Sequence, residues 1–142
     1  MRAGSAAKLY TPDVLSLATQ LAQFPLEGDF PLRADARSRT CGSTLEIGLA
    51  TRADGTVGRI GMRVSACAIG QAAAAIFAQE ASYRTLADFE RARDAIEAWL
   101  AGGQTMPAWP GLATLDAARQ HSARHGAILL PWSAAIEALS KG

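Results

Sequence analysis

The residues of this 142-residue chain best suited to chemistry are its two cysteines, Cys41 and Cys67, which lie 26 residues apart. As thiolates they could bind a soft metal ion or exchange sulfur with another thiol. Two other interpretations remain open from spacing alone. Both thiols could be buried and inert, or they could form a disulfide, which a reducing compartment disfavours.

The segment between the cysteines predicts a β-hairpin. Apolar residues alternate over 44–51, Asp54-Gly55 favours a tight turn, and a second alternating strand follows over 56–64. Because the start of the first strand lies beside the end of the second, we expect Cys41 and Cys67 at one edge of the sheet. Their sulfur atoms should then lie within several ångströms of each other.

Helices are expected on both sides of this hairpin. An alanine-rich run over 69–79 follows Cys67, and the positive end of that helix would favour a thiolate there. Thr85 and Asp88 resemble a capping box for the next helix. This helix should run through Leu100 and stop at Gly102-Gly103. The remaining pattern predicts an irregular connector over 24–40, and helices over about 12–23, 112–122 and 128–139.

The composition excludes several classes of protein. Apolar residues make up 49% and charged residues 19%, which favours one folded domain over residues 1–142. A net charge of +1 argues against a nucleic-acid partner. No apolar run approaches the roughly 20 residues of a membrane span, and residues 1–10 lack the apolar core of a signal peptide. We therefore expect a cytoplasmic protein that does not contact membranes.

Four motifs in order resemble the iron–sulfur cluster assembly scaffold family (NifU N-terminal domain, IscU and SufU), most closely its SufU branch. They are Leu9-Tyr10, Cys41-Gly42, Cys67-x-Ile69 and the segment from Arg124 to Trp132. The similarity covers about residues 8–139. It implies an α+β fold, in which helices pack on one face of a small antiparallel sheet, and a cysteine desulfurase as partner.

The resemblance also implies a set of metal ligands. The family holds zinc or a [2Fe–2S] cluster with three cysteines and an aspartate, of which Cys41 and Cys67 match the first two cysteines. Ser43 stands where the family has the aspartate, and Ala127 stands in the vacant position of the third cysteine. Arg124 matches a family arginine that precedes this position. Two of the four family ligands are therefore missing.

Histidine could replace a missing ligand. His121 and His125 are four residues apart, so a helix would place both on one face, and His125 lies two positions before Ala127. The alternative is that both histidines face solvent among neighbouring arginines.

These observations lead to one main hypothesis and two alternatives. The main hypothesis is a non-enzymatic, scaffold-like protein that binds iron, zinc or a [2Fe–2S] cluster weakly or transiently through Cys41 and Cys67. A homodimer would supply four thiolates to a shared cluster. The first alternative is a metal-free interaction protein that carries no cofactor. The second, an enzyme with Cys41 as nucleophile and a histidine base, is disfavoured because no residue that would orient the base is visible.

Overall fold

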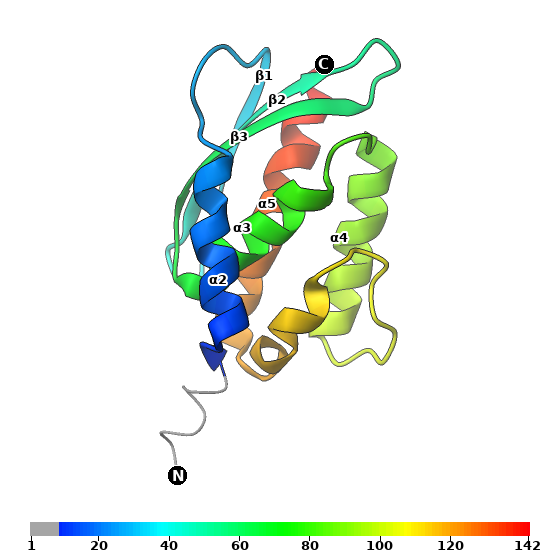
Figure 1. Ribbon diagram of the computed structural model, residues 1–142. Helices are drawn as coiled ribbons and strands as arrows, with labels where there is room; N and C mark the ends of the chain where they lie inside the picture. Colours follow the sequence, from blue (N-terminus) through cyan, green and yellow to red (C-terminus); the bar gives the residue numbers. More distant parts are fainter. Residues whose placement is uncertain (1–8) are drawn as a thin grey trace.

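The computed structural model describes residues 9–142. The prediction that residues 1–10 do not form a signal peptide therefore falls mostly outside the described residues. A three-stranded antiparallel sheet in the order β1-β2-β3 carries the helices on one face (Figure 1). This arrangement confirms the α+β prediction. The elements are α2 (Pro12–Gln20), η1 (Leu21–Gln23), β1 (Leu32–Arg37), β2 (Thr44–Thr51), β3 (Val57–Ser65), α3 (Ala68–Glu80), α4 (Leu86–Leu100), η2 (Leu112–Gln120), η3 (Ser122–Arg124) and α5 (His125–Ser140).

The predicted hairpin is confirmed as β2 and β3. Leu45, Ile47 and Leu49 are buried against the helices, as their alternation requires. On the opposite face Gly48 pairs with Gly61, and the segment around Phe30 covers this pair. A Cβ atom on Gly61 would lie 2.5 Å from the Pro25 carbonyl oxygen, so the segment approaches the sheet where there is no side chain.

The expectation of an irregular connector over 24–40 is wrong, because this segment contains β1. Six residues of β1 pair with β2, from Leu32 opposite Leu49 to Arg37 opposite Thr44. The apolar positions of β1 are Leu32, Ala34 and Ala36, which alternate with charged residues. Two of the three are alanines, which are weak strand formers, so the alternation was faint.

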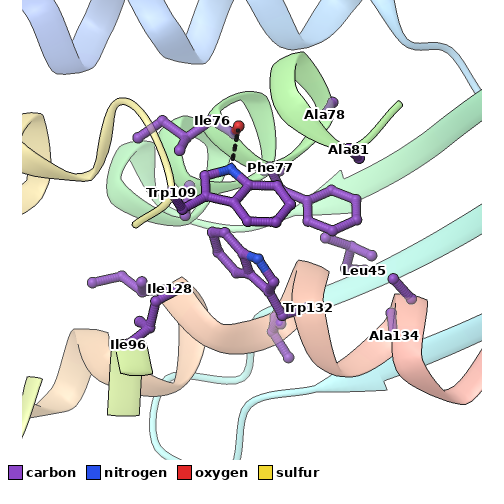
Figure 2. Close-up of a cluster of buried hydrophobic side chains, with 14 of the residues drawn as sticks. Leu45, Ile76, Phe77, Ala78, Ala81, Ile96, Trp109, Ile128, Trp132 and Ala134 are labelled. Atoms are coloured by element: carbon purple, nitrogen blue, oxygen red, sulfur yellow. Dashed lines mark hydrogen bonds between the residues drawn. The ribbon is translucent and has the colours of Figure 1, made fainter. Parts of the chain in front are cut away.

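The alanine-rich helix α3 lies at the centre of the molecule, and it packs against both α2 and α5. Its small side chains are fully buried and allow close approach of the neighbouring helices. Aromatic rings fill the space beside it (Figure 2): Phe77 stacks on Trp109 at 5.7 Å between ring centroids, and Trp132 meets both rings edge-on. All three tryptophans of the chain are buried, so they belong to the core and not to a docking surface.

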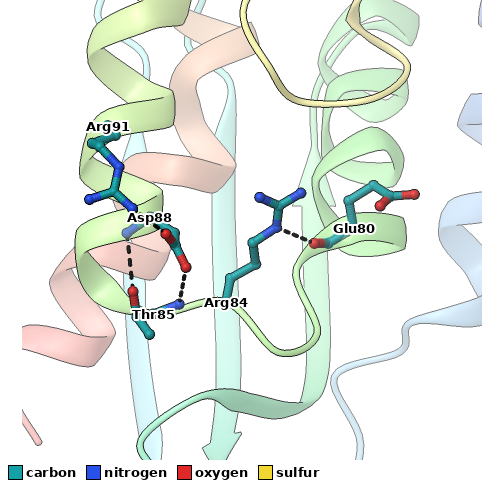
Figure 3. Close-up of polar contacts among 5 residues, drawn as sticks. All are labelled: Glu80, Arg84, Thr85, Asp88 and Arg91. Atoms are coloured by element: carbon teal, nitrogen blue, oxygen red, sulfur yellow. Dashed lines mark hydrogen bonds and ion pairs between the residues drawn. The ribbon is translucent and has the colours of Figure 1, made fainter.

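The helix α4 begins with the predicted capping box (Figure 3). The Asp88 amide donates to the Thr85 hydroxyl at 3.2 Å, and the Asp88 carboxylate accepts from the Thr85 amide at 2.9 Å. These two bonds satisfy backbone donors that the first turn of a helix otherwise leaves free. Arg91 forms an ion pair with the same carboxylate.

The last helix begins earlier than predicted, at His125 instead of about residue 128. Pro131 lies inside α5, where it removes one backbone hydrogen-bond donor, and not in its first turn. This earlier start places Ala127 within the first turn of α5. Within residues 9–142, no helix is long and apolar enough to cross a membrane.

Candidate functional site

Cys41 lies in the loop that joins β1 to β2. The loop is closed by backbone hydrogen bonds from Ser38 to the Ser43 carbonyl at 2.8 Å and from Gly42 to the Ser38 carbonyl at 3.2 Å. Gly42 has a φ of 71°, a conformation that glycine adopts at little cost. This tight loop presents Cys41 to solvent, and its thiol is free.

Cys67 lies just after β3, as the residue that precedes and caps α3. Its carbonyl oxygen accepts from the Gln71 amide at 3.0 Å, and the Gln71 side chain donates to the Ala66 carbonyl at 2.9 Å. The thiol of Cys67 is free and half-buried against the hydrophobic core. It therefore stands at the N-terminal end of α3, as the sequence predicted.

The two thiols line one open pocket of about 280 Å³. The β2–β3 hairpin brings them together, because Thr44 and Ser65 are paired residues at the shared end of the two strands. The full lining is Cys41, Gly42, Ser43, Ser65, Ala66, Cys67 and Arg124. Three of the residues that the sequence singled out thus join Cys41 in one pocket: Ser43, Cys67 and Arg124.

Two serine hydroxyls flank the sulfur of Cys41. Its Sγ lies 3.4 Å from the Ser38 Oγ, to which the thiol donates, and 3.0 Å from the Ser43 Oγ. Hydrogen bonds from Ser38 first and Ser43 second lower the pKa of Cys41, with a smaller contribution from the charge of Arg124. Each hydroxyl can rotate to donate to a thiolate, which stabilises its charge.

The Cys41 loop is fastened to the segment that leads into α5. The Ser38 and Thr40 hydroxyls lie 3.2 Å apart, and Thr40 donates to the Ala123 carbonyl at 3.1 Å. Because Thr40 has one hydroxyl proton, Ser38 donates to Thr40 while Cys41 is a thiol that donates to Ser38. When Cys41 ionises, the Ser38 hydroxyl can turn from Thr40 and donate to the thiolate. A chain of hydrogen bonds therefore links the Cys41 sulfur to the backbone before α5.

Arg124 is held in place by Tyr10. Its guanidinium donates to the Tyr10 hydroxyl at 2.9 Å while it lines the thiol pocket. Both residues belong to the motifs that carried the family resemblance, and here they are in direct contact. The arginine thus brings a fixed positive charge to the pocket of the two thiols.

Ala127 lies near this pocket but does not line it. It is buried, and a Cβ atom on Gly70 would lie 3.3 Å from the Ala127 Cβ. Because Gly70 is three residues after Cys67, Ala127 packs against the first turn of α3. The methyl group offers no metal donor at this position.

His125 is engaged elsewhere. Its Nε2 lies 2.8 Å from the Arg119 carbonyl oxygen, and His125 is not among the residues that line the pocket. His121 is likewise absent from the lining. Within residues 9–142 no three side chains of the His, Cys, Asp or Glu type gather into a metal site. The donors present therefore do not fit the four-ligand zinc or cluster site of the family.

Sequence reasoning missed Ser38 and Thr40, which hold the Cys41 loop. Both lie in the segment that was interpreted as an irregular connector. A pair of hydroxyl residues just before a cysteine was the signal available in the sequence.

Of the comparisons with known proteins, only the one with solved structures finds matches. No protein-family model matches the sequence, and no curated protein is significantly similar to it. A crystal structure of a NifU-like protein (N-terminal) from Brucella abortus matches with a TM-score of 0.85 and 26% identity, over 96% of each chain. A candidate iron–sulfur cluster assembly scaffold protein for the SUF system from Fervidobacterium islandicum AW-1 matches with a TM-score of 0.80 and 16% identity, over 92% of this chain and 96% of its own.

The second match shows the fold alone, whereas the first also shares sequence over nearly the whole chain. A hypothetical protein of known structure matches more distantly, with a TM-score of 0.66 and 14% identity over 99% of each chain. The structural comparisons thus support the resemblance seen in the sequence: the chain has the fold of these NifU-like and SUF-system proteins, and it is similar in sequence to the NifU-like one.

Proposed function

We propose that this protein is a scaffold-like component of iron–sulfur cluster assembly that carries sulfur or iron transiently on Cys41 and Cys67. The observation that carries the proposal is the pocket that both free thiols line, in a fold shared with a NifU-like protein. It acts as a carrier and not as an enzyme, and it works in the cytoplasm, where reducing conditions keep both thiols free.

Cys41 is the residue best placed to receive sulfur. Its thiol is exposed, and the hydroxyls of Ser38 and Ser43 favour its thiolate form. The thiolate attacks the terminal sulfur of a persulfide on a cysteine desulfurase. A persulfide then forms on Cys41, and the cysteine of the desulfurase departs as its thiolate, so that no oxidant is needed.

One chain supplies only part of the ligand set that an iron–sulfur cluster needs. A [2Fe–2S] cluster takes four thiolate donors, and each chain supplies two. Two chains that face each other through their thiol pockets would complete the set. The proposed form that carries a cluster is therefore a homodimer.

The test is sulfur transfer from a cysteine desulfurase and free cysteine under anaerobic conditions, followed by mass spectrometry of the intact chain. We expect one added sulfur atom, located on Cys41 and absent in Cys41→Ala. His125→Ala serves as the control and should accept sulfur normally, because its ring bonds to the Arg119 carbonyl. A parent chain that gains no sulfur would contradict the proposed sulfur transfer.

The second candidate is a metal-free interaction protein of the same fold. The observation that favours it is the loss of two donors, with Ser43 and Ala127 in the family's ligand positions. It predicts that Cys41→Ala and Cys67→Ala bind a cysteine desulfurase as well as the parent does, while no variant takes up sulfur.

A further inference from the structure

We propose that the thiol pocket is a site for a two-coordinate soft cation of the Cu(I) class, and that it discriminates against Zn(II). The inference uses the same pocket as the proposed function but does not depend on sulfur transfer. It follows from the donors that the pocket has, the donors that it lacks, and the charges around it.

The pocket offers two sulfur donors and no second pair of ligands. Ser43 and Ser38 already bond to the Cys41 sulfur, and Arg124 brings a cation in place of a donor. His125 bonds to the Arg119 carbonyl, and Ala127 presents a methyl group. Zn(II) prefers four donors in a tetrahedron, so two of its positions would fall to exchangeable water.

A Cu(I) ion has the opposite preference. It is a soft ion that selects thiolates over oxygen donors, and two thiolates satisfy its coordination. The oxygen atoms of Ser38 and Ser43 then act as hydrogen-bond partners of the bound sulfur and not as ligands. In this respect the donor set of the pocket is complete for Cu(I) and half complete for Zn(II).

The charges of the pocket favour the same ion. Two thiolates and one Cu(I) form a complex with a net charge of −1, whereas two thiolates and one Zn(II) form a neutral one. Arg124, fixed by Tyr10, lines the pocket, and Cys67 stands at the positive end of the 13-residue helix α3. The charge of Arg124 and the positive end of α3 both stabilise the anionic Cu(I) complex, and neither stabilises the neutral Zn(II) complex.

The test measures metal affinity alone, by anaerobic competition of the reduced full chain against bicinchoninate for Cu(I) and against a chromophoric chelator for Zn(II). We expect one Cu(I) per monomer, and a loss of about 100-fold or more in affinity in both Cys41→Ser and Cys67→Ser. Arg124→Gln should weaken Cu(I) about tenfold, and Arg124→Lys should restore most of the loss. Arg91→Gln, a surface change on α4, is the matched control and should bind as the parent does.

The discriminating variant is Ser43→Asp with Ala127→Cys, which supplies the two missing donors. It should bind Zn(II) about 100-fold more tightly than the parent does, while its Cu(I) affinity changes less than about tenfold. Because buried Ala127 packs against α3, circular dichroism must show that the variant folds, and Ser43→Asp alone provides a milder second test.

Three results would overturn the inference: a Cu(I) ion shared by two chains, binding that survives loss of either cysteine, or parent affinity for Zn(II) equal to that of the double variant. Its failure is separate from that of the proposed function. If the chain accepts sulfur but does not bind Cu(I) as described, the copper site is refuted and the proposed function stands. If it binds Cu(I) as described but accepts no sulfur, only the proposed scaffold role is refuted.

Discussion

A Cβ atom on Gly126 would lie 2.6 Å from the Ser38 Oγ, so α5 meets the Cys41 loop so closely that any larger residue would have to displace the Ser38 side chain. The contact joins the first turn of α5 to the hydroxyl that donates to Thr40 and accepts from Cys41. The start of α5 thereby fixes the surroundings of the exposed thiol. Glycine is favoured at position 126 by this close approach, and not by its backbone angles.

The first prediction is that Gly126→Ala slows alkylation of Cys41 severalfold at neutral pH. The added methyl group must displace the Ser38 side chain, which removes the hydrogen bond that contributes most to lowering the pKa of Cys41. The measurement is the iodoacetamide rate of each cysteine by mass spectrometry, with Cys67 as the internal reference. Ser122→Ala, an exposed change in the neighbouring turn, is the control. An unchanged rate at Cys41 would show that Ser38 does not control its reactivity.

The second prediction concerns pH. The pKa of Cys41 is lowered from the ordinary thiol value of 9.0, chiefly by Ser38 and then by Ser43. In the metal-free chain, alkylation of Cys41 should therefore reach half its maximal rate below pH 9.0, and Ser38→Ala should move this midpoint upward. An equal midpoint in Ser38→Ala and the parent would show that Ser38 does not lower the pKa of Cys41.

The same shift links pH to stability. Between the folded and unfolded pKa values of Cys41, the folded state binds fewer protons than the unfolded state, so the unfolding free energy rises with pH. This contribution is fully present above the unfolded pKa and is lost as the pH falls through the folded pKa. The unfolding free energy of the parent and of Cys41→Ala should be measured by urea unfolding at several pH values between these two pKa values. We expect it to rise less steeply with pH in the variant than in the parent.

The third prediction tests the cover over the outer face of the sheet. A Cβ atom on Gly61 would meet the Pro25 carbonyl oxygen at 2.5 Å and the Phe30 ring at 2.8 Å, so Gly61→Ala should destabilise the fold by about 1–3 kcal/mol. Gly58→Ala in the same strand is the matched control, because its nearest contact would be an ordinary 3.4 Å. It should change stability by less than about 0.5 kcal/mol. Equal losses of unfolding free energy in the two variants would mean that the segment around Pro25 and Phe30 can move away from the sheet without destabilising the fold.

The hairpin of β2 and β3 was predictable because Leu45, Ile47 and Leu49 alternate strongly and Asp54-Gly55 marks the turn. The sharing of one pocket by Cys41 and Cys67 followed from that hairpin. The strand β1 was not predictable with the same method, because Ala34 and Ala36 carry little strand signal and depend on pairing with β2.

The surroundings of Cys41 depend on contacts that a local pattern does not contain. Thr40 bonds to the carbonyl of Ala123, which is 83 residues away along the chain. The start of α5 at His125 was hidden for a related reason, since the glycine that follows it is a poor helix former and is fixed by packing against Ser38. Tertiary contacts therefore decided the details of the site, while local alternation placed its two thiols.

The last prediction is that a [2Fe–2S] cluster, reconstituted anaerobically with iron and sulfide, forms only in a homodimer. A monomer supplies two thiolates, and neither Ser43 nor Ala127 replaces the missing donors, whereas two chains together supply four. Gel filtration with detection of the cluster absorbance should place the cluster at twice the chain mass, with one iron per chain. Cys41→Ala and Cys67→Ala should each abolish it, and His125→Ala should retain it because the ring of His125 bonds to the Arg119 carbonyl. A cluster that elutes with the monomer would show that the chain has ligands beyond the two cysteines, and loss of the cluster in His125→Ala would identify one of them.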